Sequence, residues 1–153
     1  MTPFRTAQAL ALAVPTLLMA GAWGSQYLGG LVPCEMCVWQ RWPHLFAIGI
    51  AVLGFILPKR PVIALAAIAI GVSGAIGAFH AGVEYHWWEG LTRCSQLAGN
   101  RTITDIMNTP LVRCDEAQWT LFGISLAGYN ALLSISAGLV ILALLGRKRH
   151  EPS

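Results

Sequence analysis

Residues 62–83 read VIALAAIAIGVSGAIGAFHAGV, and this stretch decides the fold. It contains no Asp, Glu, Lys or Arg, and it meets the requirement of about 20 mainly apolar residues for a transmembrane helix. Three further stretches meet or nearly meet that requirement, namely Ala7–Leu28, Arg41–Leu57 and Thr120–Leu145. The sequence therefore predicts an all-α integral membrane protein built as a bundle of four transmembrane helices.

The composition of the chain supports this prediction. Of its 153 residues, 56% are hydrophobic and 11% are charged, whereas soluble domains contain about 25% charged residues. Outside the apolar stretches there are short connections and one polar loop, Glu84–Trp119, which joins the third and fourth helices. We therefore expect one membrane domain over residues 1–153, with spans at about 7–28, 37–57, 62–83 and 120–145.

The first span resembles a secretory signal peptide, because Arg5 precedes an apolar run with small residues at its end. No charged residue occurs between Arg5 and Glu35, so the uncharged run is longer than the roughly 7–15 residues of a signal core. This length favours a retained transmembrane helix.

The distribution of charge predicts the orientation, because cytoplasmic segments near helix ends are rich in Lys and Arg. The side that holds both termini carries a net +5, from six basic residues and one acidic residue: Arg5, Lys59, Arg60, Arg147, Lys148, Arg149 and Glu151. The opposite side has four basic and six acidic residues, a net −2. We expect both termini in the cytoplasm, and we interpret the basic residues as topology signals rather than as a nucleic-acid site.

All four cysteines fall on the outward side of this topology: Cys34, Cys37, Cys94 and Cys114. Disulfides persist in oxidising compartments and are rare in the cytosol. The distribution, two cysteines beside each outer loop, fits a pair of exchanging disulfides on the periplasmic face. Two purely structural disulfides are the alternative.

The first cysteine pair is predicted to lie at the start of a helix. The apolar run His44–Leu57 has 14 residues and spans about 21 Å, too short for a hydrocarbon core of about 30 Å. The second helix must therefore begin near Cys37, which gives Cys34-Glu35-Met36-Cys37 at a helix N-terminus. Such cysteines have lowered thiol pKa values, and Arg41 follows Cys37 by one turn on the same face.

Other polar and aromatic residues could contact a flat ligand near Arg41. Pro43 leaves the Trp39 carbonyl without its helical partner, and Trp39 and Trp42 could stack on a ligand or lie in the interfacial belt. His80 and His86, at the end of the third span, could hydrogen-bond a carbonyl of such a ligand. Polar and small residues deeper in the spans are predicted to mediate helix packing: Asn130, Ser125, Ser134, Gly71, Gly74 and Gly77.

Several of these residues together resemble the DsbB family of disulfide bond formation proteins. The matching motifs are Cys34-x-x-Cys37-x-x-Gln40-Arg41, Gly82-Val83-Glu84, Trp87-Trp88, Cys114-Asp115, Trp119 and Phe122-Gly123-x-Ser125. The likeness covers nearly the whole chain. It implies a bacterial inner-membrane enzyme that oxidises a periplasmic DsbA-like thioredoxin-fold protein and passes the electrons to ubiquinone or menaquinone.

The resemblance also implies roles for individual residues. Cys94 would form the mixed disulfide with the donor protein, and Cys114 would be its loop partner. Cys34 would exchange with Cys114, leaving Cys37 as the thiolate that faces the quinone. Arg41 would stabilise the negative charge that develops on the quinone, and either His80 or His86 would lie near it.

Two alternatives to the redox enzyme remain open at this stage. A non-redox membrane scaffold or transporter would function without its cysteines. A structural zinc module would use the four thiolates, although zinc thiolates on an oxidising face would compete with disulfide formation, so we expect no metal site. Attachment of a c-type haem needs His directly after the second Cys, and Val38 stands there instead.

Overall fold

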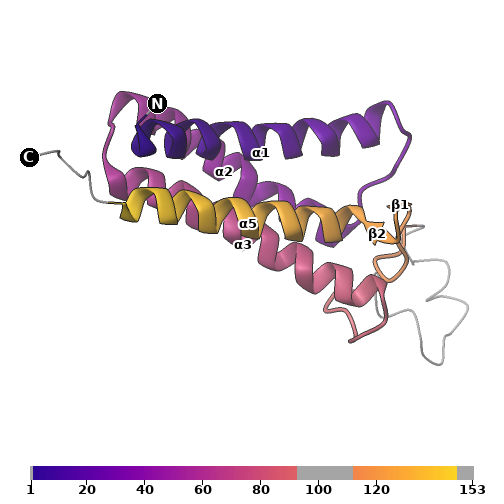
Figure 1. Cartoon of the computed structure of the whole chain (residues 1–153). Coiled ribbons are helices and arrows are strands. Elements are labelled where there is room, and N and C mark those ends of the chain that lie inside the picture. The colour runs from indigo at the N-terminus through magenta and orange to yellow at the C-terminus, as the bar shows by residue number, and fades with distance from the viewer. Residues whose placement is uncertain (1, 93–111, 148–153) are drawn as a thin grey trace, which may run out of the picture.

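The computed structural model describes residues 2–92 and 112–147. Within these ranges it contains helices α1 (Pro3–Tyr27), α2 (Glu35–Ile56), α3 (Arg60–Glu84) and α5 (Leu126–Gly146), and strands β1 (Thr120–Leu121) and β2 (Ile124–Ser125). The four helices run side by side in alternating directions (Figure 1). The start of α1 and the end of α5 lie at one end of the bundle, and the two strands lie at the other.

Three of the helices, α1, α3 and α5, are long and apolar enough to cross a membrane. Helix α2 is not among them, although its 22 residues would extend about 33 Å. Its outer half contains Gln40, Arg41 and His44, which lower its mean hydropathy. The predicted count of four apolar spans is therefore confirmed for three helices, and the membrane crossing of α2 stays a prediction.

Small residues allow the helices to approach closely. A Cβ atom placed on Gly77 of α3 would lie 2.9 Å from the Ala127 carbonyl oxygen, and one on Gly74 would lie 3.0 Å from the Ile135 amide nitrogen. The predicted packing role of Gly74 and Gly77 is thus confirmed. A Cβ on Gly71 itself would meet nothing within 4 Å, but a Cβ on Gly138 of α5 would lie 3.6 Å from the Gly71 amide nitrogen, so the Gly71 backbone also lies at the α3–α5 contact.

The predicted start of the last span at Thr120 was wrong. Residues 120–125 form a β-hairpin in which Thr120 pairs with Ser125 and Leu121 with Ile124. The two turn residues, Phe122 and Gly123, have φ values of 51° and 77°. Positive φ at both central residues matches the twist of a two-residue hairpin. Helix α5 begins only at Leu126, where the Ser125 hydroxyl accepts a hydrogen bond from the Gly128 amide at 3.1 Å.

Candidate functional site

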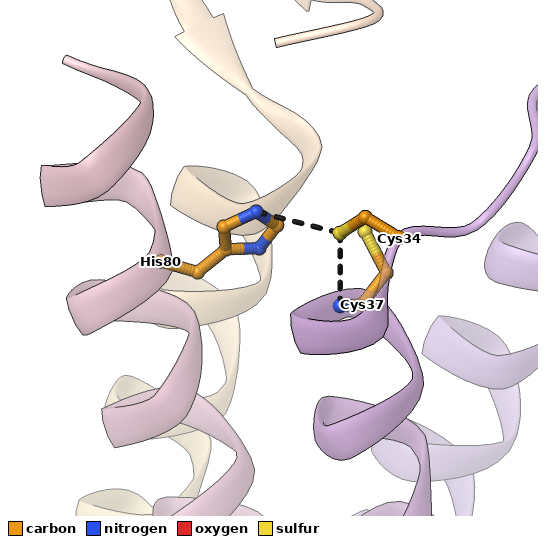
Figure 2. A group of neighbouring side chains, drawn as sticks. All are labelled: Cys34, Cys37 and His80. Atoms are coloured by element: carbon orange, nitrogen blue, oxygen red, sulfur yellow. Dashed lines mark hydrogen bonds between the residues drawn. The ribbon is translucent and has the colours of Figure 1, made fainter. Parts of the chain in front are cut away.

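The first cysteine pair lies at the start of α2, as its spacing predicts. Cys34 is the N-cap residue, and its sulfur accepts a hydrogen bond from the Cys37 amide at 3.1 Å (Figure 2). The first amides of a helix have no partner within the helix, and here a cysteine sulfur takes the place that a Ser or Asp oxygen usually fills. Both cysteines are free thiols, Cys34 buried and Cys37 half-buried.

His80 extends from α3 toward this pair. Its Nε2 lies 3.5 Å from the Cys34 sulfur, as Figure 2 shows. The ring is 1% exposed, and its other nitrogen, Nδ1, lies 2.9 Å from the Gln40 side-chain nitrogen. Glu84, one turn further along α3, places a carboxylate oxygen 3.7 Å from His80 Nε2.

Cys114 lies beside Cys34. Both belong to a buried cluster with Met36 and Val83, and the backbone of Cys114 interacts with the His80 ring. Cys114 is disulfide-bonded, whereas Cys34 and Cys37 are reduced. Cys94, the other predicted loop cysteine, lies outside the described residues. The structure thus brings one loop cysteine and the α2 pair together.

Ionisable groups at this end of the bundle influence one another. The Cys34 thiol donates toward the Cys37 sulfur and is buried, and both effects raise the pKa of Cys34 well above that of an ordinary thiol. The lowered thiol pKa expected from the helix N-terminus is therefore wrong for Cys34. Near Cys114, the Arg113 guanidinium donates to both carboxylate oxygens of Asp115, at 3.0 and 2.7 Å. This contact lowers the pKa of Asp115.

A cavity of about 250 Å³ adjoins the cysteines. Its lining combines apolar side chains of α1 with Cys37, Arg41 and His44 of α2. Arg41 donates to the Gln26 side-chain oxygen at 2.6 Å, which directs the guanidinium across the space between α1 and α2. An apolar cavity with a few polar groups is typical of a small-molecule site.

Of the other described residues predicted to contact a ligand, only one lines the cavity. His80 lines the cavity, but His86 is exposed and is not among the lining residues that the structure describes. Trp39 and Trp42 are 41% and 67% exposed and, among the described residues, are likewise absent from the lining. The structure therefore favours His80 over His86 and the belt interpretation for both tryptophans.

Sequence analysis missed a buried polar cluster beneath the cysteines. Gln40, His44 and Asn130 meet there, with Asn130 donating to the Gln40 side-chain oxygen at 2.8 Å and His44 Nε2 lying 2.9 Å from the Asn130 side-chain oxygen. Of these, only Asn130 was expected to form interhelical hydrogen bonds, and that prediction is confirmed. Ser134 bonds within its own helix, to Asn130. The Ser125 hydroxyl caps α5 and its side chain also hydrogen-bonds the Glu84 side chain of α3, so the prediction is confirmed for Ser125. The available signal was the presence of Gln and His inside an otherwise apolar helix.

Comparisons with known proteins identify the family of this chain. The family model described as "Disulfide bond formation protein DsbB" matches residues 4–144. Disulfide bond formation protein B of Verminephrobacter eiseniae is 30% identical, over 95% of this chain and 88% of that protein. Uncharacterized protein RP370 of Rickettsia prowazekii is 25% identical, over 88% of this chain and 83% of that protein. No solved structure matches the chain. With a match over nearly its full length, the chain belongs to the DsbB family of disulfide bond formation proteins.

Proposed function

We propose that this protein oxidises a periplasmic DsbA-like thioredoxin-fold protein and transfers the electrons to a membrane quinone. One observation carries the proposal: Cys34 packs beside the loop cysteine Cys114 on one side, while its partner Cys37 lines the cavity that also contains Arg41. Electrons can therefore pass by sulfur exchange from a loop that faces water to a cavity at membrane level.

The exchange steps balance in atoms and electrons. A dithiol of the donor protein reduces the Cys94–Cys114 disulfide and becomes a disulfide itself. A thiolate of Cys114 then attacks Cys34 of the oxidised α2 pair, and the sulfur–sulfur bond to Cys37 breaks. Attack of Cys94 on Cys114 restores the loop disulfide and leaves Cys34 and Cys37 reduced. Each step is thiolate–disulfide exchange, whose direction depends on the difference in reduction potential.

The state of the described cysteines corresponds to the end of this sequence, with Cys114 oxidised and the α2 pair reduced. To complete a cycle, Cys34 and Cys37 must form a disulfide and give up two electrons and two protons. A quinone, when bound, would accept both electrons and both protons and leave as the quinol.

The residues that line the cavity fit such a group. Arg41 provides a cationic donor for a carbonyl oxygen, and Leu17 and Leu18 provide apolar contacts from α1. His44 Nδ1 is buried and has no hydrogen-bond partner among the described residues, so one polar atom near the cavity is free to meet a ligand. Arg41 would act by stabilising negative charge in a site from which water is excluded.

The proposal is tested with purified protein in detergent. We expect a soluble quinone to be reduced only when a reduced thioredoxin-fold dithiol protein is supplied, and we expect Cys37→Ser to abolish the reaction because no α2 disulfide can form. The matched histidine variants are His80→Ala, expected to slow turnover, and His86→Ala, expected to leave it unchanged. Quinone reduction by the Cys37→Ser protein at the unaltered rate would contradict the proposal.

A further inference from the structure

A chain of hydrogen bonds connects the centre of the bundle to the Cys34 sulfur. The contacts of Asn130 fix which atom donates and which accepts at the inner end of this chain. The Asn130 side-chain nitrogen lies 3.2 Å from the backbone oxygen of Ser73. A carbonyl oxygen only accepts hydrogen bonds, so the amide nitrogen must occupy this position. The Asn130 side-chain oxygen then faces the Ser134 hydroxyl at 2.8 Å.

The orientation of Gln40 is fixed in the same way. Its side-chain nitrogen lies 3.2 Å from the Met36 carbonyl oxygen, and its side-chain oxygen accepts from Asn130 at 2.8 Å. Exchanging the two atoms would place a donor against a donor and an acceptor against an acceptor. The Gln40 nitrogen is therefore also the atom that lies 2.9 Å from His80 Nδ1.

The tautomer of His80 follows from this contact. The Gln40 nitrogen can only donate, so His80 Nδ1 must accept, and the single ring proton must be on Nε2. The opposite side of the ring agrees, because Nε2 faces the Cys34 sulfur at 3.5 Å and the Glu84 carboxylate at 3.7 Å. The ring also hydrogen-bonds the backbone of Cys114, which shares the Nε2 proton with the Cys34 sulfur. Gln40 and His80 are 8% and 1% exposed, so little water is present to replace these partners.

We infer that Gln40 and Asn130 are positioning residues that hold His80 as a neutral ring with its proton on Nε2, directed at the Cys34 sulfur. In the imidazolium form of His80, Nδ1 would also carry a proton, and that proton would point at the Gln40 amide hydrogens. The cluster therefore disfavours the imidazolium form. His80 is thus a fixed hydrogen-bond donor and not a general base for Cys34.

The same tautomer determines whether Cys34, Cys37 and His80 could bind a metal ion. The ligating atoms of Cys34, Cys37 and His80 lie within 4.8 Å of one another, close enough for one metal ion. A histidine that binds metal through Nε2 carries its proton on Nδ1 and donates it to an acceptor. Gln40 offers a donor there instead, so these three residues do not fit a metal ion while the amide chain is intact.

The role of the His80 Nε2–H group during thiol–disulfide exchange rests on the proposed function. When the Cys34–Cys114 bond is broken, Cys34 leaves as a thiolate, and the His80 Nε2–H and the Cys37 amide would both donate to its sulfur. Charge-assisted hydrogen bonds are the stronger ones, so the developing negative charge gains most from donors that are already in place.

Two-bond ¹H–¹⁵N correlation spectra of the reduced, ¹⁵N-histidine-labelled protein in detergent test the inference directly. We expect His80 to show a protonated Nε2 and an unprotonated Nδ1, and this pattern to persist across neutral pH. His44 should show the same tautomer, because its Nε2 faces the Asn130 oxygen at 2.9 Å. His86→Ala and His80→Ala proteins assign the signals, and exposed His86 serves as an internal reference.

Gln40→Glu should place a proton on Nδ1, because a carboxylate oxygen accepts hydrogen bonds and would accept one from a protonated His80 Nδ1. Gln40→Met removes both the donor to His80 and the acceptor for Asn130 without adding an acceptor beside His80 Nδ1. It is the control for disruption of the cluster and should not place the proton on Nδ1 specifically. A protonated Nδ1 on His80 in the unaltered protein would overturn the inference while leaving quinone reduction possible. The expected tautomer without any quinone reduction would instead refute the proposed function alone.

Discussion

At the scale of single residues, Cys34 combines a structural and a chemical role. Its sulfur caps α2 through the Cys37 amide, which satisfies a backbone donor that would otherwise lack a partner. The same sulfur receives the His80 contact and packs against Cys114. A serine at this position would keep the cap but lose the exchange chemistry, so the cap alone does not explain a cysteine here.

The reduced pair should react unequally with alkylating agents. The hydrogen bond to the Cys37 sulfur and burial raise the pKa of Cys34, so at pH 8 its thiolate fraction is far below that of an ordinary thiol, whose pKa is about 8.5. We expect iodoacetamide to label Cys34 at least about tenfold more slowly than Cys37, because the thiolate is the reactive form. The rate at Cys34 should also continue to rise above pH 9, where an ordinary thiol levels off.

Mass spectrometry of peptides from protein labelled at a series of pH values measures both rates. In a Cys37→Ala protein, no side-chain atom at position 37 remains to accept the Cys34 proton, so labelling of Cys34 should accelerate although its burial is little changed. Equal rates for the two cysteines in the unaltered protein would show that the raised pKa of Cys34 is wrong.

The residues of the site differ in how far the sequence could predict them. Cys34, Cys37 and Arg41 are neighbours on one helix, so their spacing alone placed them on a shared face at the outer end of α2. Gln40 and Asn130 are ninety residues apart and meet only when α2 packs beside α5. Which amide faces which depends on backbone carbonyls such as those of Met36 and Ser73, and no local pattern encodes that arrangement.

At the scale of helices and strands, length and apolarity predicted the spans well, because both properties are local. The hairpin at residues 120–125 was missed because its apolar side chains merge with those of α5 in a hydropathy window. The signal that was present is Gly123, which supports the positive φ of its turn. Tyr85 fastens this hairpin to the end of α3, donating to the Gly123 carbonyl at 2.9 Å and accepting from the Ser125 amide at 3.0 Å.

Packing between α3 and α5 should be sensitive to added volume at one glycine. Gly77→Ala places a methyl group 2.9 Å from the Ala127 carbonyl and 3.0 Å from the Asn130 side-chain nitrogen. Backbone cannot move aside as a flexible side chain can, so we expect a loss of about 1–3 kcal/mol, the usual cost of overpacking. Unfolding in detergent, followed by tryptophan fluorescence or scanning calorimetry, measures the change.

Gly71→Ala is the matched control, since it adds the same methyl group to the same helix where nothing lies within 4 Å. Its stability should equal or slightly exceed that of the unaltered protein, because alanine favours helix over glycine. If both variants lost the same stability, helix propensity or lipid contact rather than the α3–α5 contact would be responsible.

At the scale of the whole molecule, the arrangement of the helices places the redox residues at one end of the bundle. The hairpin and the start of α2 lie at the end opposite the start of α1 and the end of α5 (Figure 1). Cys34 is the N-cap of α2, and Cys114 packs against it. The short connection between α2 and α3, which holds Lys59, lies with the termini. The connection that holds Lys59 and the cysteine cluster thus lie at opposite ends of the bundle, although Arg41 and Arg113 lie near the cysteines.

This separation predicts how the protein is oriented in the bacterial inner membrane. In the topology expected from the sequence, the side with the termini carries a net +5 and the side with the cysteines −2, and basic segments near helix ends are retained in the cytoplasm. We therefore expect a fluorescent protein fused after Ser153 to fluoresce, because it folds in the cytoplasm, and alkaline phosphatase at the same site to be inactive. Phosphatase fused after Glu89, beyond α3, should be active, since that position would be periplasmic. The opposite pattern would put the cysteines in the reducing cytosol, where a disulfide at Cys114 would not persist, and it would exclude oxidation of a periplasmic partner even if quinone reduction were observed in detergent.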